Sequence, residues 1–377
     1  MFFHTSILPD EVKIRTYHPK INASKAIYGK IIDCMEKSNV TLTGTPPKLF
    51  PTLLKGFNTI ANHWYLILFP VVMDVVLWLG PKIKLKMLLM PFIKTMTQNV
   101  LKISPPEMLP TAQTYQALWD QLINQFNLTS MVRTLPIGIP SIIARQSPLT
   151  SPLGPGISYE LPTVNWVFIV LGILLLVGFL LGSIYFILVS QVTAPEAGKM
   201  SLKDVFSAYM QSLIMFCLML ILLILIAVPL LMLLSILSLI NPGIGQFFML
   251  VAAFMLLWLL MPLVFSPHGV FVLKQKALPS MLISVRLVRL FLPGTGMFVM
   301  TSILISEGLN MLWTLPDPNS WMTMIGISGH AFIITGLLAA SFIYYREGLK
   351  WMQDNLQKMA EATKMQQENG GTTLEQR

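Results

Sequence analysis

Six long apolar runs, separated by polar or Pro- and Gly-rich segments, dominate the hydrophobic pattern of this chain. Each run has at least the roughly 17 to 25 residues that a helix needs to cross the hydrocarbon core of a bilayer, and the third is longer than a usual span. The third run contains Pro229, which should tilt or kink its helix. We therefore predict six transmembrane helices, near residues 60–80, 163–190, 213–240, 245–265, 293–314 and 321–345.

The composition agrees with this pattern and narrows the class of protein. Of the residues, 54% are hydrophobic and 11% are charged, whereas soluble domains carry about 25% charged residues. We therefore expect an all-α integral membrane protein. The net charge of +9 is spread over loops and ends without a nucleic-acid-binding motif, so an anionic lipid surface is the expected partner and nucleic acid is not.

Two amphipathic segments precede predicted spans. Residues 199–213 and 276–290 each start with Lys, place a Ser eight residues later and run into an apolar segment. Their apolar residues recur at helical spacing, as in helices that lie in the membrane interface. We expect two copies of one unit, an elbow helix followed by a hairpin, within a five-helix domain of residues 161–345. The alternative is that both are generic interfacial elbows.

The segment of residues 81–160 has a different character. Residues 82–102 and 114–126 carry apolar residues on one helical face, and residues 135–162 contain so many Pro and Gly that regular structure should stop there. We predict a small helical extracytoplasmic cap closed by an irregular Pro-rich loop.

The distribution of Lys and Arg predicts the orientation. Most of the 26 basic residues fall in segments that are cytoplasmic if the N-terminus is cytoplasmic, as the positive-inside rule requires. Residues 1–59 and 346–377 would then be cytoplasmic, the latter as a short helix and a disordered tail. The expected location is a bacterial inner membrane. In an alternative topology, the run at 60–80 lies flat in the interface and five helices span.

One stretch carries a resemblance to a known family. The sequence PHGVFVLKQKALPSMLISVRLVRLFLPGTGMFV resembles the membrane-domain superfamily that includes the membrane part of glycerophosphodiester phosphodiesterases and many uncharacterised bacterial relatives. Two further stretches, LFPVVMDVVLWLGPKI and GISGHAFIITGLLAASFIYYR, look like uncharacterised bacterial multi-spanning proteins of that general kind. The resemblance covers residues 60 to 345. It implies a membrane architecture and no activity, because the soluble catalytic barrel has no counterpart in this sequence.

Ionisable residues inside the predicted spans are the candidates for a functional site. Asp74, Glu307 and His330 fall in the outer halves of their spans, and Asn310 lies one turn after Glu307. Such residues often mark ion or solute pathways, but they also serve as packing contacts between helices. A proton or solute pathway, a three-ligand Zn or Mn site and a purely structural role are the alternatives.

Small residues form a second group. GISGH, residues 326–330, is similar to the nucleophile motif of intramembrane serine proteases, but His330 is too close to Ser328 in sequence to face it on a helix. Packing surfaces for neighbouring helices explain these residues better. The predicted packing residues are Gly178, Gly182, Gly326, Gly329, Gly336 and Ala340.

The sequence favours a non-enzymatic membrane scaffold or partner-binding protein. The alternative is a transporter or lipid-handling protein with a polar pocket at Asp74, Glu307 and His330, and an intramembrane hydrolase is a more remote hypothesis. We expect no catalytic residue, no metal and no cofactor. A protein partner or a homo-oligomer is compatible with the sequence.

Overall fold

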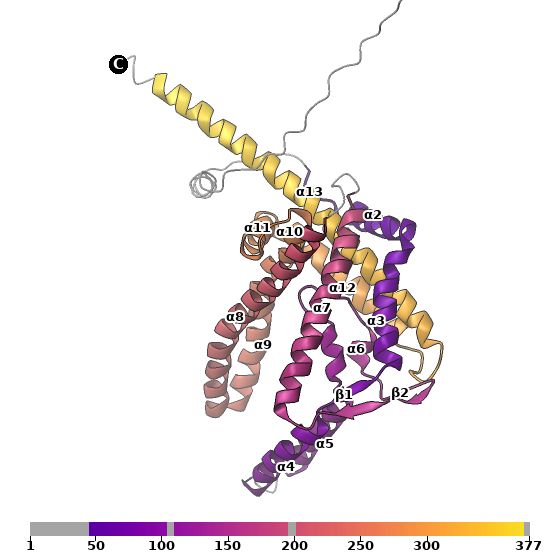
Figure 1. Cartoon of the computed structure of the whole chain (residues 1–377). Coiled ribbons are helices and arrows are strands. Elements are labelled where there is room, and N and C mark those ends of the chain that lie inside the picture. The colour runs from indigo at the N-terminus through magenta and orange to yellow at the C-terminus, as the bar shows by residue number, and fades with distance from the viewer. Residues whose placement is uncertain (1–44, 104–108, 195–200, 373–377) are drawn as a thin grey trace, which may run out of the picture. The chain divides into compact units, whose positions relative to one another are not determined.

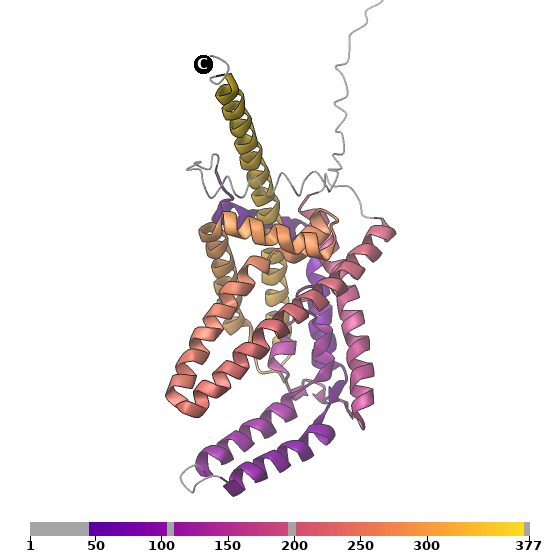
Figure 2. The ribbon, with the colours of Figure 1, turned by 90° about the vertical axis from the view of Figure 1, so that its left-hand side faces the viewer.

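The computed structural model describes residues 45–103, 109–194 and 201–372. Residues Thr45–Lys350 form one compact unit, and a second unit holds the chain from Trp351 onward. Within the first unit, α2, α10 and α11 lie at one end of a helical bundle, and α4 and α5 lie at the other end (Figures 1 and 2).

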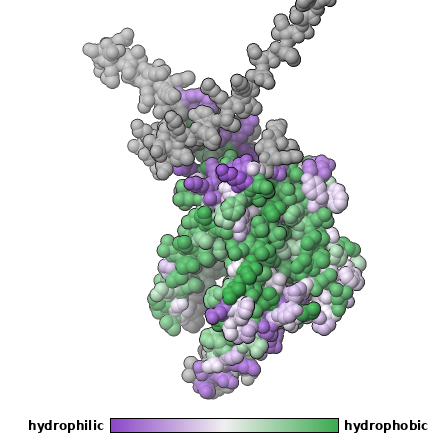
Figure 3. Space-filling view, viewed as in Figure 1, coloured by the Kyte–Doolittle hydropathy of each residue, from purple (hydrophilic) through white to green (hydrophobic). Residues whose placement is uncertain are grey.

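Five helical segments are long and apolar enough to cross a membrane, or up to six if a bent pair counts as one span. They are Val164–Val192 (α7), Leu202–Ile240 (α8), Gly243–Val272, Leu292–Trp313 (α12) and Thr323–Lys358. The third contains α9 (Pro242–Leu260), a 3-10 turn and α10 (Ser266–Val272), and the last is part of α13 (Thr323–Thr372). The prediction of a helical membrane protein is confirmed at this level. A continuous apolar face covers α7, α8 and α9 in Figure 3, with hydrophilic side chains above and below it.

The first predicted span, residues 60–80, is not one helix. Helix α2 (Leu49–Asn62) ends at His63, and the chain turns by 92° into the 3-10 turn η1 (Trp64–Ile67) and α3 (Leu68–Leu79). At about 1.5 Å per residue, the straight part is about 24 Å long, which is shorter than a typical bilayer core of about 30 Å. Helix α2, within the segment expected to be a cytoplasmic N-terminal region, packs against α13, because Lys55 forms a 2.7 Å ion pair with Glu347.

The first predicted elbow, residues 199–213, has no boundary with the span that follows. Helix α8 is continuous from Leu202 to Ile240, with Pro229 inside it. Its start is fixed by the Asp204 carboxylate, which accepts a hydrogen bond from the Ser201 backbone N–H at 3.1 Å. The second predicted elbow is a separate helix, α11 (Ala277–Leu290), and a break at Phe291 separates it from α12. The two predicted elbow-and-hairpin units therefore differ.

The turn between α8 and α9 follows from its sequence. Asn241 caps α9 by accepting hydrogen bonds from the backbone N–H groups of Gly243 (2.8 Å) and Ile244 (3.2 Å). Pro242 occupies the first turn, where its missing N–H costs no hydrogen bond. The result is a tight antiparallel hairpin, which contacts the rest of the bundle mainly at its base.

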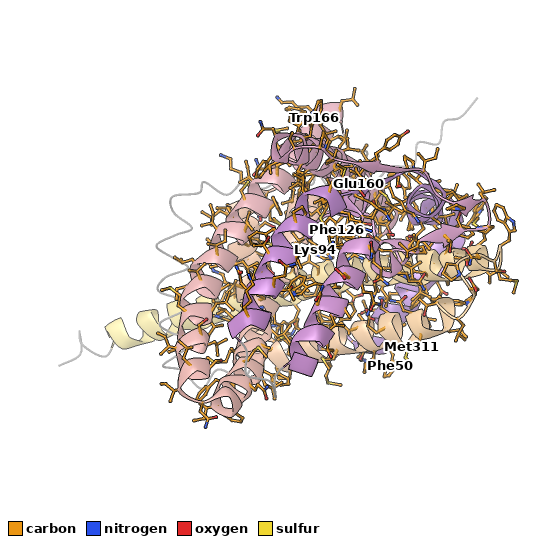
Figure 4. The ribbon with its side chains drawn as sticks, turned by 90° about the horizontal axis from the view of Figure 1, so that it is seen from below. Phe50, Lys94, Phe126, Glu160, Trp166 and Met311 are labelled. Atoms are coloured by element: carbon orange, nitrogen blue, oxygen red, sulfur yellow. The ribbon has the colours of Figure 1, made fainter. Side chains whose placement is uncertain are left out.

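The segment expected to form a cap contains helices and two small sheets. Residues Lys82–Lys84 are strand β1 rather than the start of a helix, and they pair in parallel with β4 (Ser158–Glu160). Strands β2 (Thr150–Ser151) and β3 (Gly154–Pro155) form an antiparallel pair. Helices α4 (Lys86–Ile103) and α5 (Leu109–Gln125) lie side by side across one end of the bundle (Figure 4).

The remaining expectations concern the chain ends. The C-terminal segment is expected to be a short helix and a disordered tail, but α13 continues as a helix to Thr372. Most of the predicted N-terminal segment, residues 1–44, lies outside the described residues, as do residues 373–377.

Candidate functional site around the buried loop

The irregular loop that follows the 3-10 turn η3 (Leu128–Val132) is buried inside the bundle. Ile137, Ile139 and Ile142 are at most 3% exposed, and the loop ends in the short helix α6 (Ile143–Gln146). The sequence predicts an irregular segment here. Because the segment is rich in Pro and Gly, its composition does not indicate that its isoleucines belong to the core. We refer to residues 133–146 as the buried loop.

The buried loop explains the glycines of α7. A Cβ atom on Gly182 would lie 2.6 Å from the Gly138 Cα atom, and a Cβ on Gly178 would collide with the Val132 carbonyl oxygen. These two glycines therefore permit close approach of the buried loop and of Val132 just before it, rather than of another helix.

Asp74 of α3 is completely buried and binds the start of α6. Its carboxylate accepts hydrogen bonds from the Ser141 hydroxyl and from the backbone N–H groups of Ile142 (3.3 Å) and Ile143 (3.0 Å). Free N–H groups at a helix N-terminus attract an anion. The Ser141 oxygen in turn accepts a hydrogen bond from the Ala144 N–H at 2.9 Å. Asp74 thus holds the buried loop against α3.

Two arginines of the buried loop extend this polar cluster. The Arg133 guanidinium donates to the Ser141 carbonyl oxygen at 3.2 Å. Arg145 forms an ion pair with Glu307 of α12, and both side chains are at least half exposed. The loop therefore connects Asp74 and Glu307, which do not contact each other.

His330 of α13 pairs with Asn310 of α12 across 2.8 Å, between Nδ1 and Oδ1. The histidine is 6% exposed, and its Nε2 atom has no hydrogen-bond partner among the described residues. Arg133, Arg145 and Glu307 all lie within electrostatic range of the ring. The four predicted polar residues thus form three separate contacts. Asp74 binds the start of α6, Glu307 pairs with Arg145, and His330 pairs with Asn310.

The predicted small residues of α13 all lie at close contacts. A Cβ on Gly326 would collide with the Trp313 carbonyl oxygen, and one on Gly329 would lie 2.8 Å from the Trp313 ring. Further along α13, a Cβ on Gly336 would collide with the Phe57 ring, and Ala340 faces Gly56 of α2. Ser328 is exposed on an open apolar hollow of about 550 Å³, lined by Ile67, Trp313, Met324, Ile325, Gly329 and Phe332.

A second buried histidine, His268, also has a polar partner, and the sequence did not predict this pair. The His268 Nε2 atom lies 2.7 Å from the Ser341 hydroxyl oxygen, and rings of Phe265, Phe342 and Tyr345 surround the imidazole. Its Nδ1 atom has no partner among the described residues, so the carboxylate that would orient a catalytic base is not observed there. The 73-residue separation of the pair gives no signal in the sequence.

The fold is that of a helical membrane protein, and its polar cluster is arranged around a buried loop. Within the described residues, no group of three His, Cys, Asp or Glu side chains is arranged to hold a metal ion. Comparisons with protein-family models, curated proteins and solved structures found no match for this chain. The resemblance to phosphodiesterase membrane domains therefore stays a prediction.

Proposed function

We propose that this chain is a non-enzymatic membrane scaffold that binds a partner through its apolar helices. Its expected place is a bacterial inner membrane, with both termini cytoplasmic. The observation that carries the proposal is the hydrogen bonding of the Asp74 carboxylate. Because its carboxylate oxygens accept hydrogen bonds from Ser141, Ile142 and Ile143, it is an anchor for the buried loop. A proton pathway would instead need a carboxylate that faces a wet cavity.

The α8–α9 hairpin is the surface we assign to the partner. None of the residues in the most apolar stretch of α8 is buried, and only 6% are buried in the stretch that contains α9, against 56% in α13. Large side chains such as Leu225 and Phe254 are about two-thirds exposed. A partner helix could pack on this hairpin through van der Waals contacts, which drive helix association in lipid.

Site-specific photocrosslinking tests the scaffold proposal. A photoreactive amino acid at Leu225 or Phe254 should give discrete protein adducts in intact membranes. Ile173 of α7 is 56% exposed and serves as the matched control, because lipid alone should cover it. Adducts of equal yield at all three positions, or at none, would contradict the proposal.

The open hollow next to Ser328 favours lipid handling as a second candidate function. Its wall is almost entirely apolar and includes side chains from η1, α12 and α13, as a site for an acyl chain requires. Replacing Gly329 by Leu would fill the hollow but also press on the Trp313 ring, so Ser328→Leu is the better variant. If lipid handling is the function, this variant should stop crosslinking of a photoreactive lipid without changing the hairpin adducts.

A further inference from the structure

Two lysines of β1 reach one small cavity close to the end of α3. Lys82 is 5% exposed, and its ammonium group donates a hydrogen bond to the Pro148 carbonyl oxygen. The Lys84 ammonium donates to the Asn124 carbonyl oxygen at 3.4 Å. Pro148 and Asn124 line the same cavity as the two lysines, so both ammonium groups bind residues of its wall.

Among the described residues, these charges have no negative partner. An ammonium group carries three N–H donors, and each of these two has one acceptor among the described residues. Neither lysine forms an ion pair within the described part of the chain. Glu160 is the register partner of Lys84, but its carboxylate accepts a hydrogen bond from the Met87 N–H at 3.2 Å. A buried charge without a counter-ion is costly.

The cavity also holds an unused hydroxyl group. Ser130 lines it, and the Ser130 Oγ atom is buried without a hydrogen-bond partner among the described residues. The cavity has a volume of about 10 Å³ and is partly open, which is room for one body the size of a water oxygen. Two ammonium groups and one hydroxyl around such a space match a single anionic oxygen atom.

The position of the cavity makes a lipid headgroup one source of that oxygen. Leu77 near the end of α3 lines it, and the neighbouring residue, Trp78, packs edge-on against Trp321 with ring centroids 5.8 Å apart. Tryptophans of membrane proteins gather at the level of the lipid headgroups. Figure 4 views this end of the bundle and labels Phe126, which lines the cavity, and Glu160 of β4.

We propose that this cavity binds one oxygen of a phosphate group, held by Lys82, Lys84 and the Ser130 hydroxyl. The phosphate belongs to a phospholipid headgroup or is free in solution, and the same three donors serve either source. Desolvation, with a smaller contribution from Lys84, lowers the pKa of Lys82, and a bound anion relieves both effects.

Thermal unfolding of the full-length protein in detergent tests this site. Sodium phosphate is titrated against sodium chloride at equal ionic strength, and phosphatidylglycerol is compared with phosphatidylcholine in the micelles. A ligand that binds only the folded state raises the unfolding temperature in a saturable way. We expect phosphate or phosphatidylglycerol to do so for the natural protein. A shift with inorganic phosphate indicates free phosphate, and a shift with phosphatidylglycerol alone indicates a headgroup.

Three variants make the result specific. Lys82→Met should abolish the shift, and Ser130→Ala should raise the dissociation constant about tenfold, the loss of about one hydrogen bond to a charged group. Lys94→Met removes an exposed lysine of α4 and should leave the shift intact. If Lys82→Met fails to fold, Lys84→Met replaces it. The proposal is overturned if neither ligand shifts the natural protein beyond the salt control, or if Lys94→Met loses as much as Lys82→Met.

Discussion

The Asp74 carboxylate accepts a hydrogen bond from the Ile143 backbone N–H at 3.0 Å, across 69 residues of sequence. This contact joins α3 to the first turn of α6 and gives this buried acid a structural role. Without the carboxylate, two backbone N–H groups and the Ser141 hydroxyl would lose an acceptor in a buried position.

Replacing Asp74 should release the buried loop. Each buried donor left unpaired costs about 1 to 3 kcal/mol, so we expect Asp74→Ala to destabilise the protein by about 3 kcal/mol or more and Asp74→Asn by less. Limited trypsin digestion measures the effect, because Arg133 and Arg145 lie within the loop. Cleavage at both arginines should accelerate. Asp120→Asn on α5 is the control and should leave the digestion pattern unchanged.

The glycines of α7 give a second prediction. A Cβ on Gly182 would lie 2.6 Å from the Gly138 Cα atom, whereas a Cβ on Gly172 meets nothing within 4 Å. Gly182→Ala should therefore lower the unfolding temperature. Gly172→Ala on the same helix should leave it unchanged or raise it slightly, because alanine favours a helix by up to about 1 kcal/mol. Equal effects of the two substitutions in a thermal unfolding assay would show that backbone contact at Gly182 is not what matters.

The Arg145–Glu307 ion pair should contribute little to stability. Both side chains are at least half exposed, and exposed ion pairs contribute about 0 to 1 kcal/mol. We expect Glu307→Gln to unfold within a few degrees of the natural protein, in contrast to Asp74→Ala. A large loss of stability would mean that the pair is far less solvated in the membrane. Proteoliposomes test the pathway hypothesis with the same variant. That hypothesis requires Glu307→Gln to abolish any transport that the natural protein shows.

The sequence predicts the spans better than it predicts the site. Runs of more than 20 apolar residues specify membrane helices by composition alone. Helices α7, α8 and α12 are found at three of these predicted runs. The bend at His63 was missed because the apolar pattern passes through it. The continuity of α8 was missed because an amphipathic segment that precedes a span has the same pattern with or without a break.

The polar site depended on contacts that no local pattern encodes. Asp74, Glu307 and His330 could be selected as candidates from their type and depth. Their partners could not, because Ser141 and Arg145 lie in a Pro- and Gly-rich segment that has the composition of a surface loop. The burial of Lys82 was not predicted either. Alternating lysines after a span are typical of an exposed interface, yet pairing of β1 with β4 buries this one.

The buried lysine should also make stability depend on pH. Because desolvation lowers the pKa of Lys82 in the folded protein below its ordinary value near 10.5, the unfolded chain binds more protons between the two values. Stability should then rise with pH in that window. In phosphate-free buffer between about pH 7 and about pH 10, the unfolding temperature of the natural protein should rise relative to that of Lys82→Met. Lys94→Met should follow the natural protein, and a difference that stays constant across this range would show that the Lys82 ammonium is not desolvated.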